Sequence, residues 1–196
     1  MIDARFQQQL SFIKEIDKLK GVIRRINIMD GSRMENTAEH SWHIALMAAV
    51  LAEHSKEKID LLRTIKMLLV HDIVEIDAGD TFAYDKDHQK SKQERETKAA
   101  ARLFTILPID QAKEYRALWN EFEGRTTPEA KFAVAMDRLL PLMQGYALNG
   151  KVWRENGVKQ SHVLEHQKQI MHGSETIWNY CEQIINDSIV NGYLNP

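Results

Sequence analysis

The segment MLLVHDIVE, residues 67–75, places a histidine and an aspartate directly after four apolar residues. The surrounding apolar residues recur at helical spacing over residues 61–76, so a buried helix is expected there. An ionised carboxylate on such a helix is costly unless it is paired or bound to a metal. Imidazole and carboxylate together suit Zn, Mn, Fe, Co or Ni. We therefore interpret His71 and Asp72 as candidate metal ligands.

Two other expected helices carry the same kind of anomaly. His40 lies in a segment, about residues 36–54, that is apolar on almost every face and is expected to be central and buried. Asp137 lies between apolar residues in a helix opened by the cap-and-proline pair Thr127-Pro128. For any one of these residues alone, a satisfied polar group in the core is the commoner explanation. Taken together with His71 and Asp72, they favour one shared metal site.

Helical periodicity extends over most of the remaining chain, and no convincing alternating strand is present. Asn36-Thr-Ala-Glu39 has the form of a capping box, and Asp60 is a candidate cap for the next helix. Helices are expected over about residues 3–19, 36–54, 61–76, 92–106, 110–122, from 128 through 140, and 160–189 with a bend at Gly173. A loop at 21–34 and an irregular, lid-like segment at 80–91 connect them. The pattern predicts an all-α fold, a compact bundle of about six to eight helices in one domain over residues 1–196, with its core at about 10–150 and C-terminal helices at about 160–190.

Composition narrows the class of protein. Hydrophobic residues make up 43% and charged residues 28% of the chain, and the formal net charge is −2. No segment clusters Lys and Arg with aromatic residues, which argues against a nucleic-acid polymer as partner. The longest apolar run, residues 44–52, is too short to cross a bilayer, and the first residues lack the features of a signal peptide. The single cysteine, Cys181, is expected to be a structural thiol, and we expect a cytoplasmic protein with no membrane partner.

His40, the pair His71-Asp72 and the distant Asp137 follow an H…HD…D pattern, flanked by RMENTAEH at 33–40 and HDIVEIDAGD at 71–80. In these residues the chain resembles the HD-domain phosphohydrolases, and in the flanks it resembles their 5′-deoxynucleotidase branch. The resemblance covers about residues 10–150. It implies an all-α fold, one divalent metal (Mn, Co, Zn, Ni, Fe or Mg), a homodimer, and hydrolysis of nucleoside 5′-monophosphates, particularly deoxyribonucleotides.

The resemblance also implies roles for particular residues. Metal ligands would be His40, His71, Asp72 and Asp137; acid–base residues would be Glu75 and Asp80; and Arg25, Ile26 and Glu35 would lie at the substrate. Glu75 follows His71 by one helical turn and so shares its face. Ile26 stands where relatives often carry an aromatic residue, so weaker selectivity for deoxyribose is expected. The simpler alternatives are a surface residue for Glu75, a helix cap for Asp80 and a surface ion pair for Arg25.

Other functions stay open at this point. A rival HD phosphohydrolase would act on another phosphorylated metabolite or on a cyclic or polyphosphorylated nucleotide. A rival of another class is a nucleotide-binding module with a structural metal, although two carboxylates beside the ion favour catalysis. The segment His162-Val-Leu-Glu165-His166 fits the inverted zinc-peptidase motif, but its polar flanks predict an exposed histidine pair. The four tryptophans are expected in the core.

Overall fold

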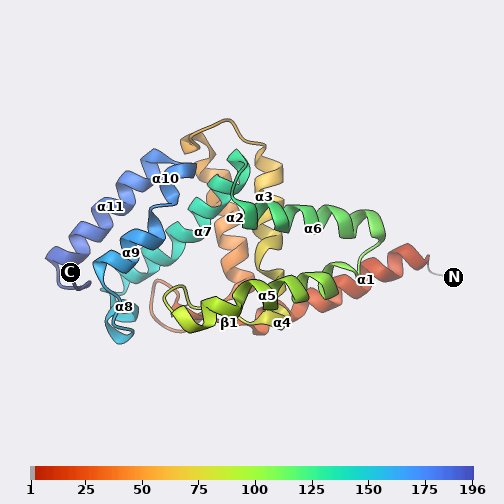
Figure 1. The fold of residues 1–196 in the computed structure, drawn as a ribbon, viewed down its shortest axis with the longest axis horizontal. Coiled ribbons are helices and arrows are strands. Elements are labelled where there is room, and N and C mark those ends of the chain that lie inside the picture. The colour runs from red at the N-terminus through yellow and green to blue at the C-terminus, as the bar shows by residue number, and fades with distance from the viewer. Residues whose placement is uncertain (1–2) are drawn as a thin grey trace.

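The computed structural model describes residues 3–196, without the side chains of residues 86 and 87. This part of the chain is mostly helical, which confirms the predicted fold class, and α1 and α11 lie at opposite ends of the molecule (Figure 1). Within it, no helix is both long enough and apolar enough to span a membrane. The elements are α1 (Ala4–Ile16), η1 (Asp17–Gly21), β1 (Ile23–Asn27), β2 (Met34–Asn36), α2 (Thr37–Leu51), η2 (Ala52–His54), α3 (Leu61–Val70), η3 (His71–Val74), α4 (Glu75–Ala78), α5 (Lys86–Phe104), α6 (Ile109–Gly124), α7 (Pro128–Ala147), α8 (Lys151–Glu155), α9 (Gln160–Gln167), α10 (Ile170–Gly173) and α11 (Glu175–Val190), where η denotes a 3-10 helix.

Helix α7 forms the centre of the larger core. It packs against α2, α3, α6, α10 and α11, and in Figure 1 it lies between α2 and the C-terminal helices. Phe132, Met136 and Leu140 on α7 are completely buried. The predicted helix start is confirmed, because the Thr127 hydroxyl accepts a hydrogen bond from the backbone N–H of Ala130 at 3.2 Å.

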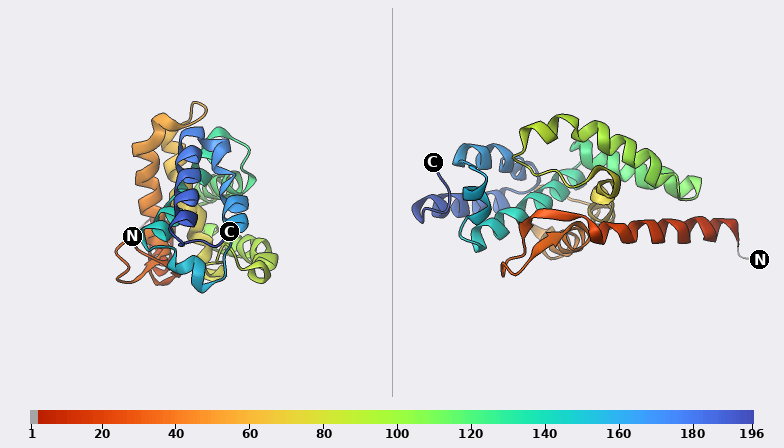
Figure 2. Two further views of the ribbon diagram at one scale, coloured as in Figure 1. Left: turned by 90° about the vertical axis from the view of Figure 1, so that its left-hand side faces the viewer. Right: turned by 90° about the horizontal axis from the view of Figure 1, so that it is seen from below.

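A second, smaller core joins the N-terminal helix to the middle of the chain. Phe12 of α1 is buried in the same cluster as Leu103 and Phe104 of α5, and residues of η3 and α6 complete this cluster. The ring of Phe12 meets the edge of Tyr115 at 5.8 Å between centroids. As a result, α1, α5 and α6 extend together beyond the rest of the molecule, as the right-hand view of Figure 2 shows.

The expectation that the chain contains no strand is wrong. β1 and β2 form an antiparallel pair in which Ile23 lies opposite Asn36 and Asn27 opposite Met34. Between these two pairs, the chain advances by four residues along β1 but by only two along β2, so the pairing contains a bulge. A five-residue strand with three polar side chains, paired with a three-residue strand, presents too little alternation to be recognised in the sequence.

The helix predicted over residues 61–76 changes geometry at its functional residues. Asp60 caps α3 as predicted, with its carboxylate accepting from the N–H of Arg63 at 3.1 Å. The α-helix then ends at Val70, and His71–Val74 form a 3-10 turn before α4 begins. 3-10 geometry inside a helix often marks a functional position. The segment expected to be irregular to residue 91 is already helical from residue 86, so the connection is shorter than predicted.

Helix α2 is only half buried, although the sequence predicted burial on almost every face. Its capping box is confirmed, because Asn36 and Glu39 exchange backbone-to-side-chain hydrogen bonds of 3.0 and 2.7 Å. However, Trp42, Leu46 and Val50 are 61%, 49% and 67% exposed. These residues recur at i, i+4 and i+8 and form one outer face of α2. The expectation of four core tryptophans is therefore wrong for Trp42.

The C-terminal helices bend where the sequence predicted. The chain breaks at Gly173, which ends α10 just before α11 begins. A Cβ atom at this position would lie 2.4 Å from the backbone oxygen of Lys131, so glycine allows α10 to approach α7 closely. The short helix α8, which buries Trp153, was not predicted.

Candidate metal and catalytic site

The four predicted metal ligands come together from three separate parts of the fold. His40 lies on α2, His71 and Asp72 on η3, and Asp137 on α7. One potential ligand atom from each of His40, His71 and Asp72 lies within 4.8 Å of the others. Asp137 Oδ1 lies 3.1 Å from His40 Nε2 and 3.6 Å from His71 Nε2. These four residues, called the metal cluster below, therefore place two imidazoles and two carboxylates around one point.

The chemistry of this cluster fits a divalent metal ion. The Nδ1–H of His71 donates a hydrogen bond to the backbone oxygen of Leu68, 2.7 Å away, while its buried Nε2 lies 3.1 Å from Asp72 Oδ2 without hydrogen-bond geometry. Burial alone would lower the pKa of His71, but the carboxylates of Asp72 and Asp137 raise it overall. The group of acids thus attracts positive charge to this point. Imidazole nitrogen and carboxylate oxygen together are the donors that transition metals accept.

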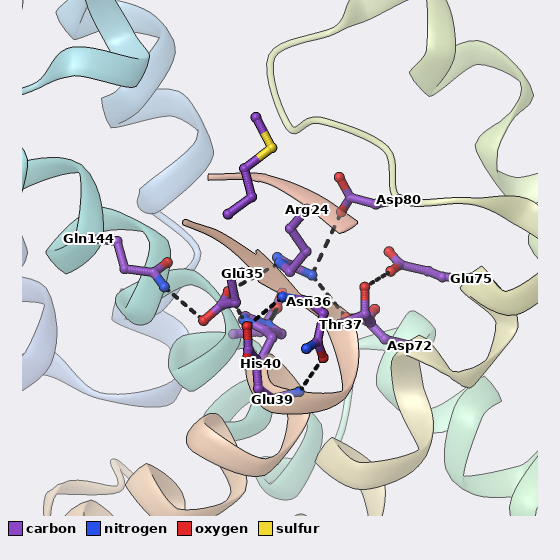
Figure 3. Close-up of polar contacts among 12 residues, drawn as sticks. Arg24, Glu35, Asn36, Thr37, Glu39, His40, Asp72, Glu75, Asp80 and Gln144 are labelled. Carbon is purple, nitrogen blue, oxygen red and sulfur yellow. Dashed lines mark hydrogen bonds and ion pairs between the residues drawn. The ribbon is translucent and has the colours of Figure 1, made fainter. Parts of the chain in front are cut away.

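His40 is held in place by a buried carboxylate behind it. Its Nδ1 lies 3.2 Å from Glu35 Oε2, and Glu35 Oε1 accepts a hydrogen bond from Gln144 at 2.7 Å. Figure 3 shows this chain of contacts from Gln144 through Glu35 to His40. Such a carboxylate fixes the orientation of a ligating histidine. Glu35 was expected at the substrate, but it lies outside the described lining of the cavity, and its contacts favour positioning of His40.

Arg24 lies among three carboxylates of the site, and the sequence analysis did not predict it as a site residue. Its guanidinium lies 3.1 Å from Asp72, 3.5 Å from Glu35 and 3.7 Å from Asp80. Burial would lower the pKa of Arg24, but the surrounding carboxylates raise it overall. Two residues further along β1, Ile26 is also buried. Recognition of this strand would have pointed to both, because side chains two residues apart share one face.

The predicted substrate residue Arg25 has a different position from Arg24. It lies at the edge of the cavity, is 60% exposed, and its Nη1 is 3.8 Å from a carboxylate oxygen of Asp85. This exposed position leaves Arg25 able to contact a ligand at the cavity entrance.

Glu75 lies near Thr37 and Asp72, and Asp80 lies near Arg24, as Figure 3 shows. Glu75 is 4% exposed, and its Oε2 accepts a hydrogen bond from the Thr37 hydroxyl at 2.9 Å. Burial, followed by the charge of Asp72, raises the pKa of Glu75 well above its ordinary value. Burial also raises the pKa of Asp80, against the opposing effect of Arg24. Two carboxyl groups with raised pKa values beside one another are suited to acid–base chemistry.

A cavity of about 320 Å³ opens in front of these residues. Its lining includes Asp72, Glu75, Asp80 and Asp137, together with other residues of α5, α6, α7 and α9. Ligand-binding cavities commonly begin at about 300 Å³. The cavity is therefore large enough to be a binding site for a small molecule next to the metal cluster.

His166 lines this cavity, which corrects the expectation of an exposed histidine pair. Its ring packs 5.7 Å from that of Tyr84, and burial lowers the pKa of His166 to about 3, so the imidazole is neutral. His162 instead forms a local contact of 3.3 Å with the backbone of Lys159. Because Glu165 between the two histidines is exposed, this segment forms no peptidase-type site.

The cavity also contains residues that sequence reasoning did not single out. Lys92 and Glu96 on α5 form an ion pair of 3.5 Å, and Glu96 is 4% exposed. Burial raises the pKa of Glu96 to about 7. On the other walls, Arg125 and Arg138 line the same cavity. Their position at the cavity could not be predicted, because in the sequence they resemble other charged residues of the surface.

The fold is helical, and it brings together the residues of the H…HD…D pattern. Comparison with known families agrees, since residues 16–178 match the model of the HD domain family. The chain belongs to the HD domain family.

Several known proteins are similar to this chain. The 5′-deoxynucleotidase HDDC2 of Homo sapiens is 30% identical over 136 residues, which are 69% of this chain and 65% of that protein. The 5′-deoxynucleotidase HDDC2 of Dictyostelium discoideum is 31% identical over 165 residues, which are 81% of this chain and 82% of that protein. A crystal structure is known for a predicted metal-dependent phosphohydrolase from Magnetospirillum magnetotacticum MS-1, whose sequence is 48% identical to this chain. The two structures match with a TM-score of 0.94 over 99% of this chain and 100% of that one. The chain thus spans slightly less than two thirds of the human relative.

Proposed function

We propose that this protein is a metal-dependent phosphohydrolase that removes phosphate from nucleoside 5′-monophosphates, particularly deoxyribonucleotides. The observation that carries the proposal is the cluster of His40, His71, Asp72 and Asp137 with Glu75 beside it at the wall of a cavity. The names of the relatives, 5′-deoxynucleotidase and metal-dependent phosphohydrolase, support the reaction class and the substrate class.

The residues that would hold the metal are His40, His71, Asp72 and Asp137. A divalent ion there, when bound, would polarise a phosphoryl oxygen and lower the pKa of the attacking water. The donor set suits Mn, Co, Zn, Ni or Fe, and the proposal includes Mg. Glu35 would keep His40 oriented.

Glu75 and Asp80 would move the protons. As the water oxygen bonds to phosphorus and the bond from phosphorus to the 5′-oxygen breaks, Glu75 takes a proton from the water. Asp80 supplies a proton to the departing 5′-oxygen. The Thr37 hydroxyl, 2.9 Å from Glu75 Oε2, holds that carboxyl group in place. Arg24 holds Asp72 and Asp80 in position by charge-assisted contacts.

The direct test is phosphate release from ribo- and deoxynucleoside 5′-monophosphates, each with Mn, Co, Zn, Ni, Fe and Mg. We expect release with at least one metal, and also turnover of p-nitrophenyl phosphate. Stoichiometric metal binding without any phosphate release would instead favour a nucleotide-binding module with a structural metal. Release only from cyclic or polyphosphorylated nucleotides would favour the rival HD phosphohydrolase.

The proposal extends to a cytoplasmic homodimer. The outer face of α2, formed by Trp42, Leu46 and Val50, is a contiguous apolar surface that a second copy could cover. Light scattering after size-exclusion chromatography would measure the mass, and Trp42→Glu is expected to give monomers. Val190→Glu, at an 85% exposed position on α11, is the matched control and should leave the mass unchanged.

A further inference from the structure

Two arginines of the cavity have no acidic partner. Arg125, which follows α6, and Arg138 on α7 line the same cavity as the metal cluster. Arg138 is 8% exposed, and its Nη1 donates to the backbone oxygen of His166. Within the described residues, neither guanidinium has a carboxylate at ion-pair distance. Arg125 is partly buried. A buried cation without a counter-charge is costly, so Arg138 in particular favours a bound anion.

Arg125 has a backbone conformation that is unfavourable for a residue other than glycine. Its φ is 51°, in the left-handed region, at the position after Gly124 where helices usually end on glycine. Its Nη1 donates to the side chain of Gln169 at 2.6 Å, while its Nε is buried without a partner. Residues in such conformations persist where the surrounding structure enforces them, and they cluster at binding sites.

The neighbouring charges compensate the two arginines only in part. Asp137 attracts Arg138, whereas Arg125 repels it. Asp137, next to Arg138 in the chain, directs its carboxylate to His40 and His71, where it would hold the metal. Lys92, a third cation of the cavity, has its own partner in Glu96. Of the cations that line the cavity, Arg125 and Arg138 are therefore the two with no carboxylate at ion-pair distance within the described residues.

We propose that Arg125 and Arg138 form a second anion subsite, which binds a second phosphate group of the substrate. The inference rests on the proposed function, in which the first phosphate lies at the metal cluster. Arg24 cannot take this role, because Asp72, Glu35 and Asp80 surround its guanidinium. Guanidinium groups bind phosphate through paired, charge-assisted hydrogen bonds. Among the nucleotides that the proposed reaction accepts, those that carry a second phosphate group should then be preferred, and water cleaves only the phosphate at the metal cluster.

The substrate test compares kcat/KM for dAMP, deoxyadenosine 3′,5′-bisphosphate and dADP with the metal-loaded enzyme. One charge-assisted contact corresponds to about tenfold or more in affinity, so we expect at least one doubly phosphorylated substrate to exceed dAMP by that factor. Preference for the bisphosphate would place the second phosphate on the sugar. Preference for dADP would place it in a linear chain.

The variants separate binding from folding. Arg138→Met and Arg125→Gly should each reduce the preference over dAMP to near unity, and glycine at 125 should preserve folding because it suits a positive φ. Arg154→Met is the matched control: this exposed arginine also donates to a backbone oxygen, that of Asn149, but lies outside the described lining of the cavity. It should keep the wild-type ratio.

Calorimetry provides a readout that does not need turnover. Metal-loaded Glu75→Gln should bind the bisphosphate about tenfold or more tightly than dAMP, and adding Arg125→Gly should remove the difference. Hydrolysis of dAMP with no gain from a second phosphate would overturn the subsite and leave the proposed function intact. If no nucleotide is hydrolysed, the proposed function fails. Independently of turnover, tighter binding of the bisphosphate than of dAMP that persists in the Arg125→Gly variant would overturn the subsite.

Discussion

At the scale of single residues, Glu75 combines almost complete burial with a position beside the metal cluster. Replacing it by glutamine keeps the shape and the contact with Thr37 but removes the ability to accept a proton. General acid–base groups contribute about a hundred- to ten-thousand-fold in rate, so Glu75→Gln should lose activity by that factor while retaining stoichiometric metal. Glu53→Gln, at an exposed position, is the control. Near-normal turnover of Glu75→Gln would exclude the proton-transfer role.

Ile26 provides a second test at this scale, because it is buried at 9% exposure in the wall of the cavity. A hydrophobic pocket rejects an added hydroxyl by only about a hundredfold, and a side chain smaller than an aromatic ring should reject the ribose 2′-hydroxyl less strongly. We expect activity on both dAMP and AMP, with the kcat/KM ratio rising in Ile26→Trp. Complete exclusion of AMP by the native enzyme, unchanged by tryptophan, would show that Ile26 does not set the selectivity.

The approach of His40, His71, Asp72 and Asp137 to one another could be predicted from the sequence because these polar residues interrupt apolar helical patterns. His40, His71 and Asp137 interrupt apolar helical faces, and such interruptions are visible without a structure. Arg24 could not be found in this way, since it lies among other arginines in a segment expected to be a loop. Arg125 and Arg138 become distinctive only when the fold shows which charges lack a partner.

At the scale of elements, the turn after α4 sets the position of Asp80. Gly79 ends α4 with φ of 74° and ψ of 154°, and no heavy atom lies within 4 Å of the Cβ that alanine would add. The cost of Gly79→Ala is therefore conformational, about 1–3 kcal/mol. We expect lower stability in chemical denaturation and a reduced kcat.

Gly124→Ala is the matched control for this change, because Gly124 is helical and equally uncrowded. It should be neutral or stabilise the protein by about 0.5–1 kcal/mol. Equal effects of the two alanines would show that the backbone conformation at Gly79 is not what positions Asp80.

Helix starts that depend on local hydrogen bonds could be predicted from the sequence, whereas features that depend on tertiary packing could not. Caps at Asn36, Asp60 and Thr127 use local hydrogen bonds, and all three are confirmed. The break at His71 is a tertiary effect, because the residues there keep good helical periodicity. The outer face of α2 is as apolar as its inner face, so its sequence cannot show which side meets the core.

At the scale of the whole molecule, the candidate ligands link parts of the chain that otherwise meet only through packing. His40 on α2, His71 and Asp72 on η3, and Asp137 on α7 belong to elements separated by long stretches of sequence. The carboxylates of Asp72 and Asp137 lie 3.1–3.6 Å from the imidazoles of His40 and His71. An ion at their centre would connect the three elements and relieve the repulsion between Asp72 and Asp137.

Metal binding should therefore stabilise the entire fold. A ligand that binds only the native state at one hundred times its Kd contributes about 2.7 kcal/mol. For a chain of this size, 1 kcal/mol corresponds to about 2–4 °C in Tm. We expect the saturating metal to raise Tm by about 5–10 °C over the chelator-treated protein. His71→Ala should lose this shift together with activity and stoichiometric metal, because it removes the candidate ligand whose buried Nε2 lies 3.1 Å from Asp72 and 3.6 Å from Asp137. His43→Ala, one turn from His40 on α2, is the control and should keep the shift. A full complement of metal in His71→Ala, or loss of the shift in His43→Ala, would mean that the ion is held by a different set of residues.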